Sequence, residues 1–207
     1  MTVKIALMEL NLQELITSAG LWAIYATVFV ESGLLIGFFL PGDTLLFAAG
    51  LYASLPGGFN IFYLIVGTIM AAILGDNFGY FLGSRYGSRV FKREESLFFH
   101  KDHARKAEEF YKKYGPITIV LARFIPVIRA FAPVLAGVGK MNYGTFVAYN
   151  IIGGILWVSS MSLLGYYLGS QIPNIDKYVL PIILTAVIGS IIAPPLITLA
   201  RRMVKNG

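Results

Sequence analysis

Two acids and two arginines stand inside segments that are otherwise apolar enough for a membrane: Glu31, Asp43, Arg123 and Arg129. A charged side chain near the centre of a bilayer costs roughly 2.5–3.5 kcal/mol, so four cost on the order of 10 kcal/mol. Carboxylates can bind and release protons, and guanidinium groups bind phosphate or carboxylate oxygens through a planar fork of donors. The four residues therefore predict a polar site inside a membrane protein, where charge meets substrate or proton.

The composition supports a membrane location. Of the 207 residues, 57% are hydrophobic and 14% are charged, and the mean hydropathy is +0.70. A spanning helix needs roughly 20 residues, and three longer segments without Asp, Glu, Lys or Arg are 44–75, 141–175 and 178–200. The chain has no Cys, which excludes disulfides and thiolate metal ligands. We expect an all-α integral membrane protein with about three full spans, and neither a metal nor a cofactor.

Basic residues gather in one loop and at the C-terminus. Nine of the seventeen Lys and Arg residues lie between 85 and 113, and three more lie between 201 and 205. The positive-inside rule places both clusters, and hence the C-terminus, on the cytoplasmic side of the cytoplasmic (inner) membrane. Five acidic residues dilute the charge of the loop, so we expect an amphipathic segment on anionic lipid and no binding of nucleic acid.

The segment between the two basic clusters must cross the membrane an even number of times. Residues 143–170 and 178–200 supply two crossings, so the apolar segment 115–140 is expected to turn back without crossing. Pro126 and Pro133 would break it into a re-entrant hairpin that enters from the cytoplasmic side. Backbone groups freed by such breaks must line a wet or protein-packed cavity, where a substrate can bind.

A repeated motif predicts a second hairpin of opposite orientation. The sequence Gly-Tyr-Phe-Leu-Gly-Ser at 79–84 recurs as Gly-Tyr-Tyr-Leu-Gly-Ser at 165–170, 86 positions later, and the same offset relates Asp43 to Arg129. The copies end on opposite sides of the membrane, as in the inverted repeats of transporters. By this symmetry residues 20–55 form the opposing re-entrant hairpin, broken at Pro41 and Gly42.

The expected arrangement is a single membrane domain over residues 1–207. Its predicted parts are an interfacial helix (1–19), hairpin 1 (20–55), a transmembrane helix (58–84), a basic cytoplasmic segment (85–114), hairpin 2 (115–140) and two transmembrane helices (143–170 and 178–200). With both hairpin tips at mid-membrane, two carboxylates would face two guanidinium groups, which lowers the desolvation cost of each. Such a quartet is either a structural staple or a transport site, and two opposed hairpins favour transport.

Residues within the first long span carry two further predictions. Asp76 lies near its middle, where it could relay protons or pair with a neighbour such as Asn77. Glycines recur every four residues and predict close packing of helices rather than substrate contact; they are Gly75, Gly79, Gly83 and Gly87.

The order of these motifs resembles the DedA family of bacterial membrane proteins, also called SNARE-associated or VTT-domain proteins. The resemblance runs over about residues 20–170 and rests on Glu31, Pro41-Gly42-Asp43, Gly75-Asp76-Asn77, Arg123-Phe124-Ile125-Pro126, Arg129 and Pro133. A single proline at position 41 departs from the denser proline motif that is common in relatives. The resemblance implies two opposed re-entrant hairpins and movement of undecaprenyl phosphate or other phospholipids, dependent on the proton motive force. It also implies that Glu31 with Asp43, and Arg123 with Arg129, are the acidic and arginine pairs.

The leading hypothesis is thus a flippase-like transporter for a lipid with an anionic headgroup. Arg123 and Arg129 would bind the headgroup, while Glu31, Asp43 and Asp76 would couple transport to protons, or to sodium. The alternative is a proton-coupled exporter or ion exchanger for small solutes.

A membrane lipid phosphatase is disfavoured, and we expect no enzyme activity. The spans lack the catalytic His or Cys of such enzymes, because both histidines, His100 and His103, lie in the charged loop. The sequence leaves the oligomeric state open, with a homodimer among the alternatives.

Overall fold

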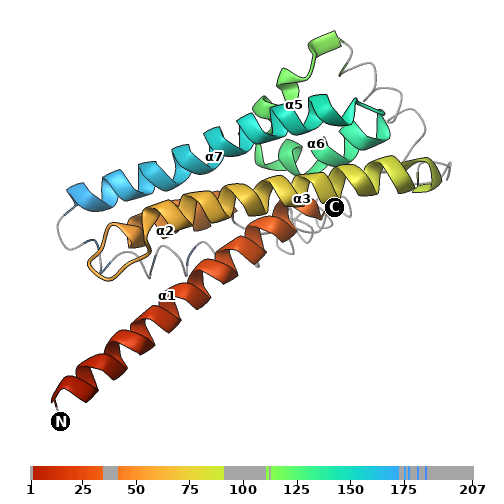
Figure 1. Cartoon of the computed structure of the whole chain (residues 1–207). Helices are drawn as coiled ribbons and strands as arrows, with labels where there is room; N and C mark the ends of the chain where they lie inside the picture. Colours follow the sequence, from red (N-terminus) through yellow and green to blue (C-terminus); the bar gives the residue numbers. More distant parts are fainter. Residues whose placement is uncertain are drawn as a thin grey trace, which may run out of the picture. The chain divides into compact units, whose positions relative to one another are not determined.

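The computed structural model describes residues 2–34, 42–90, 111 and 113–172, with four single positions further on: 175, 177, 181 and 185. Every regular element in these ranges is a helix, which confirms the all-α class (Figure 1). The helices are α1 (Thr2–Gly33), α2 (Gly42–Ala53), α3 (Ile61–Val90), α5 (Ile117–Ala122), α6 (Pro126–Val138) and α7 (Tyr143–Gln171).

Two of these helices are long and apolar enough to cross a membrane. They are Ile61–Tyr86 of α3, with 26 residues, and Tyr143–Gln171 of α7, with 29 residues. Both occupy segments in which spans were predicted. The third predicted span, 178–200, lies outside the described residues apart from positions 181 and 185, as does most of the basic segment 85–114.

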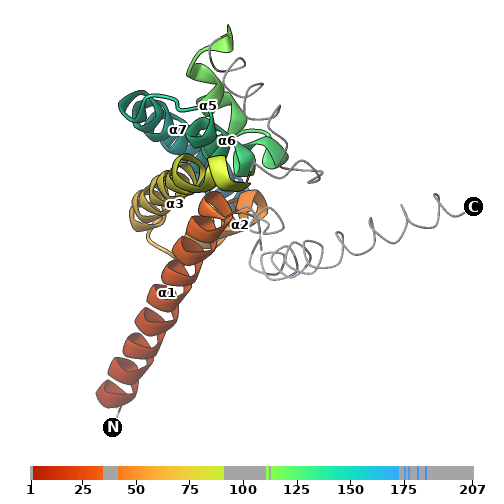
Figure 2. The same cartoon turned by 90° about the vertical axis from the view of Figure 1, so that its right-hand side faces the viewer.

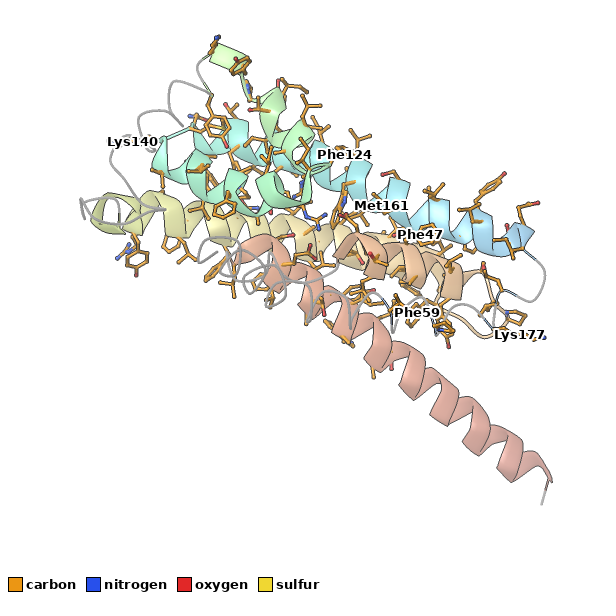
Figure 3. The ribbon with its side chains drawn as sticks, turned by 180° about the vertical axis from the view of Figure 1, so that it is seen from behind. Phe47, Phe59, Phe124, Lys140, Met161 and Lys177 are labelled. Carbon is orange, nitrogen blue, oxygen red and sulfur yellow. The ribbon has the colours of Figure 1, made fainter. Side chains whose placement is uncertain are left out.

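Helix α1 differs from the prediction, because no boundary near residue 19 separates an interfacial helix from a hairpin. It runs for 32 residues without interruption. The segment contains no Pro, and Gly20, at the predicted boundary, is accommodated within the helix. A Cβ on Gly20 would lie 3.0 Å from the ring of Phe59, which is labelled in Figure 3, so the absent side chain leaves room for that ring.

The chain divides into two compact units, with the divisions inside α1, α3 and α7. The first consists of Met1–Thr27, Phe39–Thr68 and Ser159–Gly207, and the second of Val28–Phe38 and Ile69–Val158.

In the first unit, α2 packs on the C-terminal half of α7 through direct backbone approach. A Cβ on Gly50 would lie 2.2 Å from the carbonyl oxygen of Ser162, and one on Gly165 would lie 2.1 Å from that of Phe47. Phe47 and Met161 are labelled on these two ribbons in Figure 3. Glycine is therefore required at both positions, because any larger residue would separate the two backbones.

In the second unit, α6 packs on α3 in the same manner, and Figures 1 and 2 both draw them side by side. A Cβ on Gly137 would lie 2.2 Å from the carbonyl oxygen of Tyr80, and one on Gly83 would lie 2.1 Å from that of Val134. A Cβ on Gly75 would lie 2.6 Å from the carbonyl oxygen of Phe29. The prediction that these glycines allow close packing of helices is confirmed at Gly75 and Gly83, whereas a Cβ on Gly79 would meet its nearest neighbour at 3.4 Å.

Two tyrosines fasten α6 through its carbonyl groups and those of the turn after it. The hydroxyl of Tyr80 donates to the carbonyl oxygen of Met141 at 2.5 Å, and that of Tyr111 donates to Ala132 at 2.9 Å. Burial raises the pKa of the Tyr111 phenol, so it remains a neutral donor at physiological pH.

The proline positions correct one detail of the predicted hairpin breaks. The chain turns between α5 and α6 at 123–125, and Pro126 begins α6 at a position where no backbone N–H is needed. Pro133, predicted as a second break, lies inside α6, and the helix continues to Val138. Only one intrahelical hydrogen bond is lost there, which the surrounding packing tolerates. Gly42 begins α2, whereas Pro41 lies outside the described residues.

Adding a single methyl group at Gly83 should test the backbone contact between α3 and α6. Gly83→Ala places its Cβ against the carbonyl of Val134, and overpacking costs about 1–3 kcal/mol. We expect the apparent melting temperature in detergent to fall by roughly 3–10 °C. Gly79→Ala is the matched control one turn away, because its Cβ would have no neighbour nearer than 3.4 Å. Equal melting temperatures for the two variants would contradict this account.

Candidate functional site

Arg129 and Glu31 form a buried ion pair in the second unit. Arg129 is the fourth residue of α6, and Glu31 lies in the last turn of α1, two residues before its end. The guanidinium group donates to the Glu31 carboxylate, and the two side chains are 12% and 4% exposed. Glu31 is thereby neutralised by a residue 98 positions further along the chain.

The aromatic ring of Trp157 supports the same guanidinium group. The central carbon of the Arg129 guanidinium lies 4.7 Å from the ring centroid, and Trp157, on α7, is only 1% exposed. A cation over an indole face is attracted by the ring quadrupole, by about 2 kcal/mol where water is excluded. Arg129 is therefore held by two different kinds of partner, one charged and one neutral.

A second ion pair joins α5, α3 and α7. The Arg123 guanidinium donates to the carboxylate of Asp76 and to the amide oxygen of Asn150. The side chains of Arg123 and Asp76 are 5% and 6% exposed, and Asn150 is completely buried. Asn150 in turn donates to the carbonyl oxygen of Ile73 at 3.3 Å, which fixes the orientation of its amide.

The two ion pairs belong to one electrostatic group. Arg129 lies close enough to act electrostatically on both Asp76 and Arg123. Two guanidinium groups and two carboxylates give a net charge of zero, and such mutual compensation lowers the cost of burying each charge. Within the described ranges, no three His, Asp or Glu side chains are grouped so that they could hold a metal ion. The group can therefore bind an anion at an arginine, or exchange a proton at a carboxylate.

The structure pairs Arg129 with Glu31, and it pairs Arg123 with Asp76, an acid that was not a member of the predicted quartet. Asp43 is half-buried in the first turn of α2, in the other compact unit, so its predicted part in proton coupling remains a prediction.

The predicted alternative for Asp76 was pairing with a neighbouring polar group such as Asn77. The Asn77 amide nitrogen donates to the carbonyl oxygen of Ile73 at 2.7 Å, and the Asp76 carboxylate accepts from Arg123. A relay role for Asp76 remains a prediction.

Two residues of the site were not recognised from the sequence. They are Trp157 and Asn150, neither of which belongs to the motifs that predicted the site. Both lie on α7, which is apolar on all sides, so sequence periodicity does not distinguish the face that meets the arginines. The one available signal was a polar amide inside a spanning segment, which has to find a partner there.

Comparison with known proteins gives the family. The VTT domain matches residues 40–167, more than half of the chain. The chain is 39% identical to protein DedA of Escherichia coli K12 over 188 residues, covering 89% of this chain and 85% of that protein. It is 42% identical to an uncharacterized membrane protein of Mycobacterium tuberculosis over 185 residues, covering 89% and 80% of the two chains. No solved structure matches. The chain therefore belongs to the DedA family of VTT-domain membrane proteins.

Proposed function

We propose that this protein moves a lipid with an anionic phosphate headgroup across the cytoplasmic membrane, driven by the proton motive force. Undecaprenyl phosphate and phospholipids are the candidate lipids. The observation that carries the proposal is the pair of Arg129 and Glu31, a partly buried guanidinium whose partner is a buried, titratable carboxylate. Phosphate and carboxylate oxygens bind the same fork of guanidinium donors, so a headgroup can take the place of Glu31.

The exchange of partners at Arg129 suggests how protons are coupled to transport. A carboxylate displaced from its guanidinium in a water-poor site is costly to keep ionised, so Glu31 takes up a proton when the headgroup arrives. When the headgroup leaves on the other side, Glu31 returns to Arg129 and releases that proton. Trp157 remains under Arg129 throughout, because its attraction does not depend on either anion. The lipid tail stays in the bilayer, and no covalent bond changes.

The proposal includes two opposed re-entrant hairpins related by an inverted repeat, with the C-terminus in the cytoplasm. Backbone packing within the two units supports the repeat. In one unit Gly50 and Gly165 bring α2 onto α7, and in the other Gly137 and Gly83 bring α6 onto α3. Each short helix after a predicted break thus packs on a long helix carrying one copy of the repeated motif, as a pair of interlocked repeats requires.

Removing the exchangeable ion pair should abolish transport without unfolding the protein. Glu31→Gln keeps an acceptor for Arg129 but cannot titrate, and we expect no gradient-driven lipid movement in proteoliposomes. Arg129→Ala alone leaves Glu31 unpaired, at a cost of about 3–5 kcal/mol in stability. The double variant Glu31→Gln/Arg129→Ala removes both charges of this pair and leaves neither uncompensated, so it should fold and remain inactive.

Arg85→Gln is the control, because Arg85 is an exposed arginine on α3. Normal lipid transport by Glu31→Gln and by the double variant would rule out this site.

The lipid and the driving force can be tested together. The protein is reconstituted into vesicles with labelled undecaprenyl phosphate or labelled phosphatidylethanolamine, and transbilayer movement is measured with and without a pH gradient. We expect movement of one of the two lipids to depend on the gradient and to lose that dependence in Glu31→Gln. Equal movement of both lipids without a gradient would instead identify a scramblase, and gradient-driven flux of a small solute alone would identify the exporter alternative.

Replacing the indole under Arg129 should weaken transport in proportion to the attraction lost. Trp157→Leu removes the aromatic face, worth about 0.5–2 kcal/mol, so we expect a loss of roughly 2- to 30-fold in the transport rate at limiting lipid. Trp157→Phe should lose less, because a phenyl ring retains part of the attraction. Trp22→Leu is the matched control, since Trp22 is 71% exposed on α1. Equal rates for Trp157→Leu and wild type would show that the ring is only packing.

A further inference from the structure

The Arg123 side chain is buried and lies against groups from α3 and α7. Asp76 and Asn150 accept its hydrogen bonds. Two consecutive glycines of α7 lie against it: a Cβ on Gly153 would be 2.9 Å from the Cδ of Arg123, and one on Gly154 would be 3.7 Å from its guanidinium carbon. The glycines thus leave a slot that the arginine side chain fills.

The environment of Arg129 differs from that of Arg123 in exposure and in the type of partner. Its side chain is more exposed, at 12% against 5% for Arg123. One of its partners is the face of a neutral ring, which an incoming anion does not have to displace. At Arg123 a headgroup would have to displace a carboxylate and a buried amide, each fixed on a different helix.

We infer that Arg123, Asp76 and Asn150 form a fixed clasp and that Arg123 is a positioning residue rather than a ligand of the headgroup. Arg123 caps the C-terminal end of α5, at the turn that leads into α6. The clasp fastens this turn to α3 through Asp76 and to α7 through Asn150, and so determines where α6 presents Arg129. The inference rests on the proposed function, because it assigns headgroup binding to Arg129 and positioning of the backbone to Arg123.

The clasp requires one carboxylate and one amide around Arg123, but it does not require the carboxylate to stand on α3. A relay or a substrate contact at Asp76 would require that position. The transposed variant Asp76→Asn/Asn150→Asp distinguishes a clasp from a relay or substrate contact at Asp76. It exchanges the carboxylate and the amide between the two helices and conserves the net charge. Asp76→Asn alone leaves the buried guanidinium without a counter-charge, and Asn150→Asp alone adds a second carboxylate.

The first test compares folded yield and lipid transport for these three variants. We expect both single variants to lose most of their monodisperse protein in detergent. The transposed variant should recover it and transport lipid within about twofold of wild type. A transposed variant that folds but is as inactive as Glu31→Gln/Arg129→Ala would overturn the inference.

A second double variant keeps the inference testable if the transposed variant does not fold. Arg123→Met/Asp76→Leu replaces the ion pair by apolar residues of similar size, a change that buried pairs often tolerate. Its recovery of folded, transporting protein would support the clasp. Failure of both double variants to fold would overturn it, because a clasp defined by charge balance accepts at least one of them.

The second test measures lipid binding next to Arg129 by tryptophan fluorescence. The chain has two tryptophans, so in a Trp22→Phe background Trp157 is the single fluorophore, and it lies beneath Arg129. Phosphatidic acid in mixed micelles is the probe, and phosphatidylcholine is the control lipid. We expect phosphatidic acid to change the emission of Trp157 with the same half-saturation, within about twofold, in the background protein and in the transposed variant. The change should be absent from Glu31→Gln/Arg129→Ala.

The two tests separate failure of the clasp from failure of the proposed function. A response lost in the folded transposed variant but present in the background protein overturns the clasp. If the background protein itself does not respond to phosphatidic acid, the proposed headgroup site is rejected for this lipid class. The folded yield of the transposed variant still tests the clasp in that case.

Discussion

Charge balance inside the membrane is the constraint on which this structure depends. A guanidinium group cannot be left alone in a water-poor interior, and neither can a carboxylate, so each has to be matched by a partner from another segment. Glu31 from α1 and Asp76 from α3 neutralise the two arginines of the α5–α6 segment. These pairings determine which helices of the second unit must meet, and α7 adds the neutral groups that complete the site.

The glycines make this charge balance possible. At the contact of α1 with α3, a Cβ on Gly33 would lie 2.9 Å from the carbonyl oxygen of Gly75, so the two backbones touch. Glu31 lies two residues before that contact and Asp76 one residue after it, which brings both acids to the same region of the unit. The periodic glycines are therefore not independent of the site, because the close approach that they allow places the carboxylates within reach of the arginines.

The sequence was sufficient for the membrane class, the family and the residues that carry buried charge, because each of these can be inferred from composition or from motifs in order. It was not sufficient for the pairing. Asp43 shares the repeat offset with Arg129 and was the natural choice for the second acid, yet the acid bound to Arg123 is Asp76. Pairing depends on how each helix is rotated about its axis, and helices that are apolar on all sides carry no stripe that reveals this rotation. For the same reason the position of Trp157 beneath Arg129 could not be predicted from the sequence.

Two arginines six positions apart have the same chemistry, so their surroundings have to distinguish them. A transport site must release its internal partner without leaving a charge uncompensated, whereas a structural pair must not release it at all. In the proposed mechanism Arg129 would meet the first requirement, because the ring of Trp157 would continue to stabilise its charge while Glu31 exchanges with an anion. Arg123 meets the second, because both of its acceptors are buried and α7 closes over it at Gly153. Under this proposal the same residue type binds substrate at one position and holds the backbone at the other.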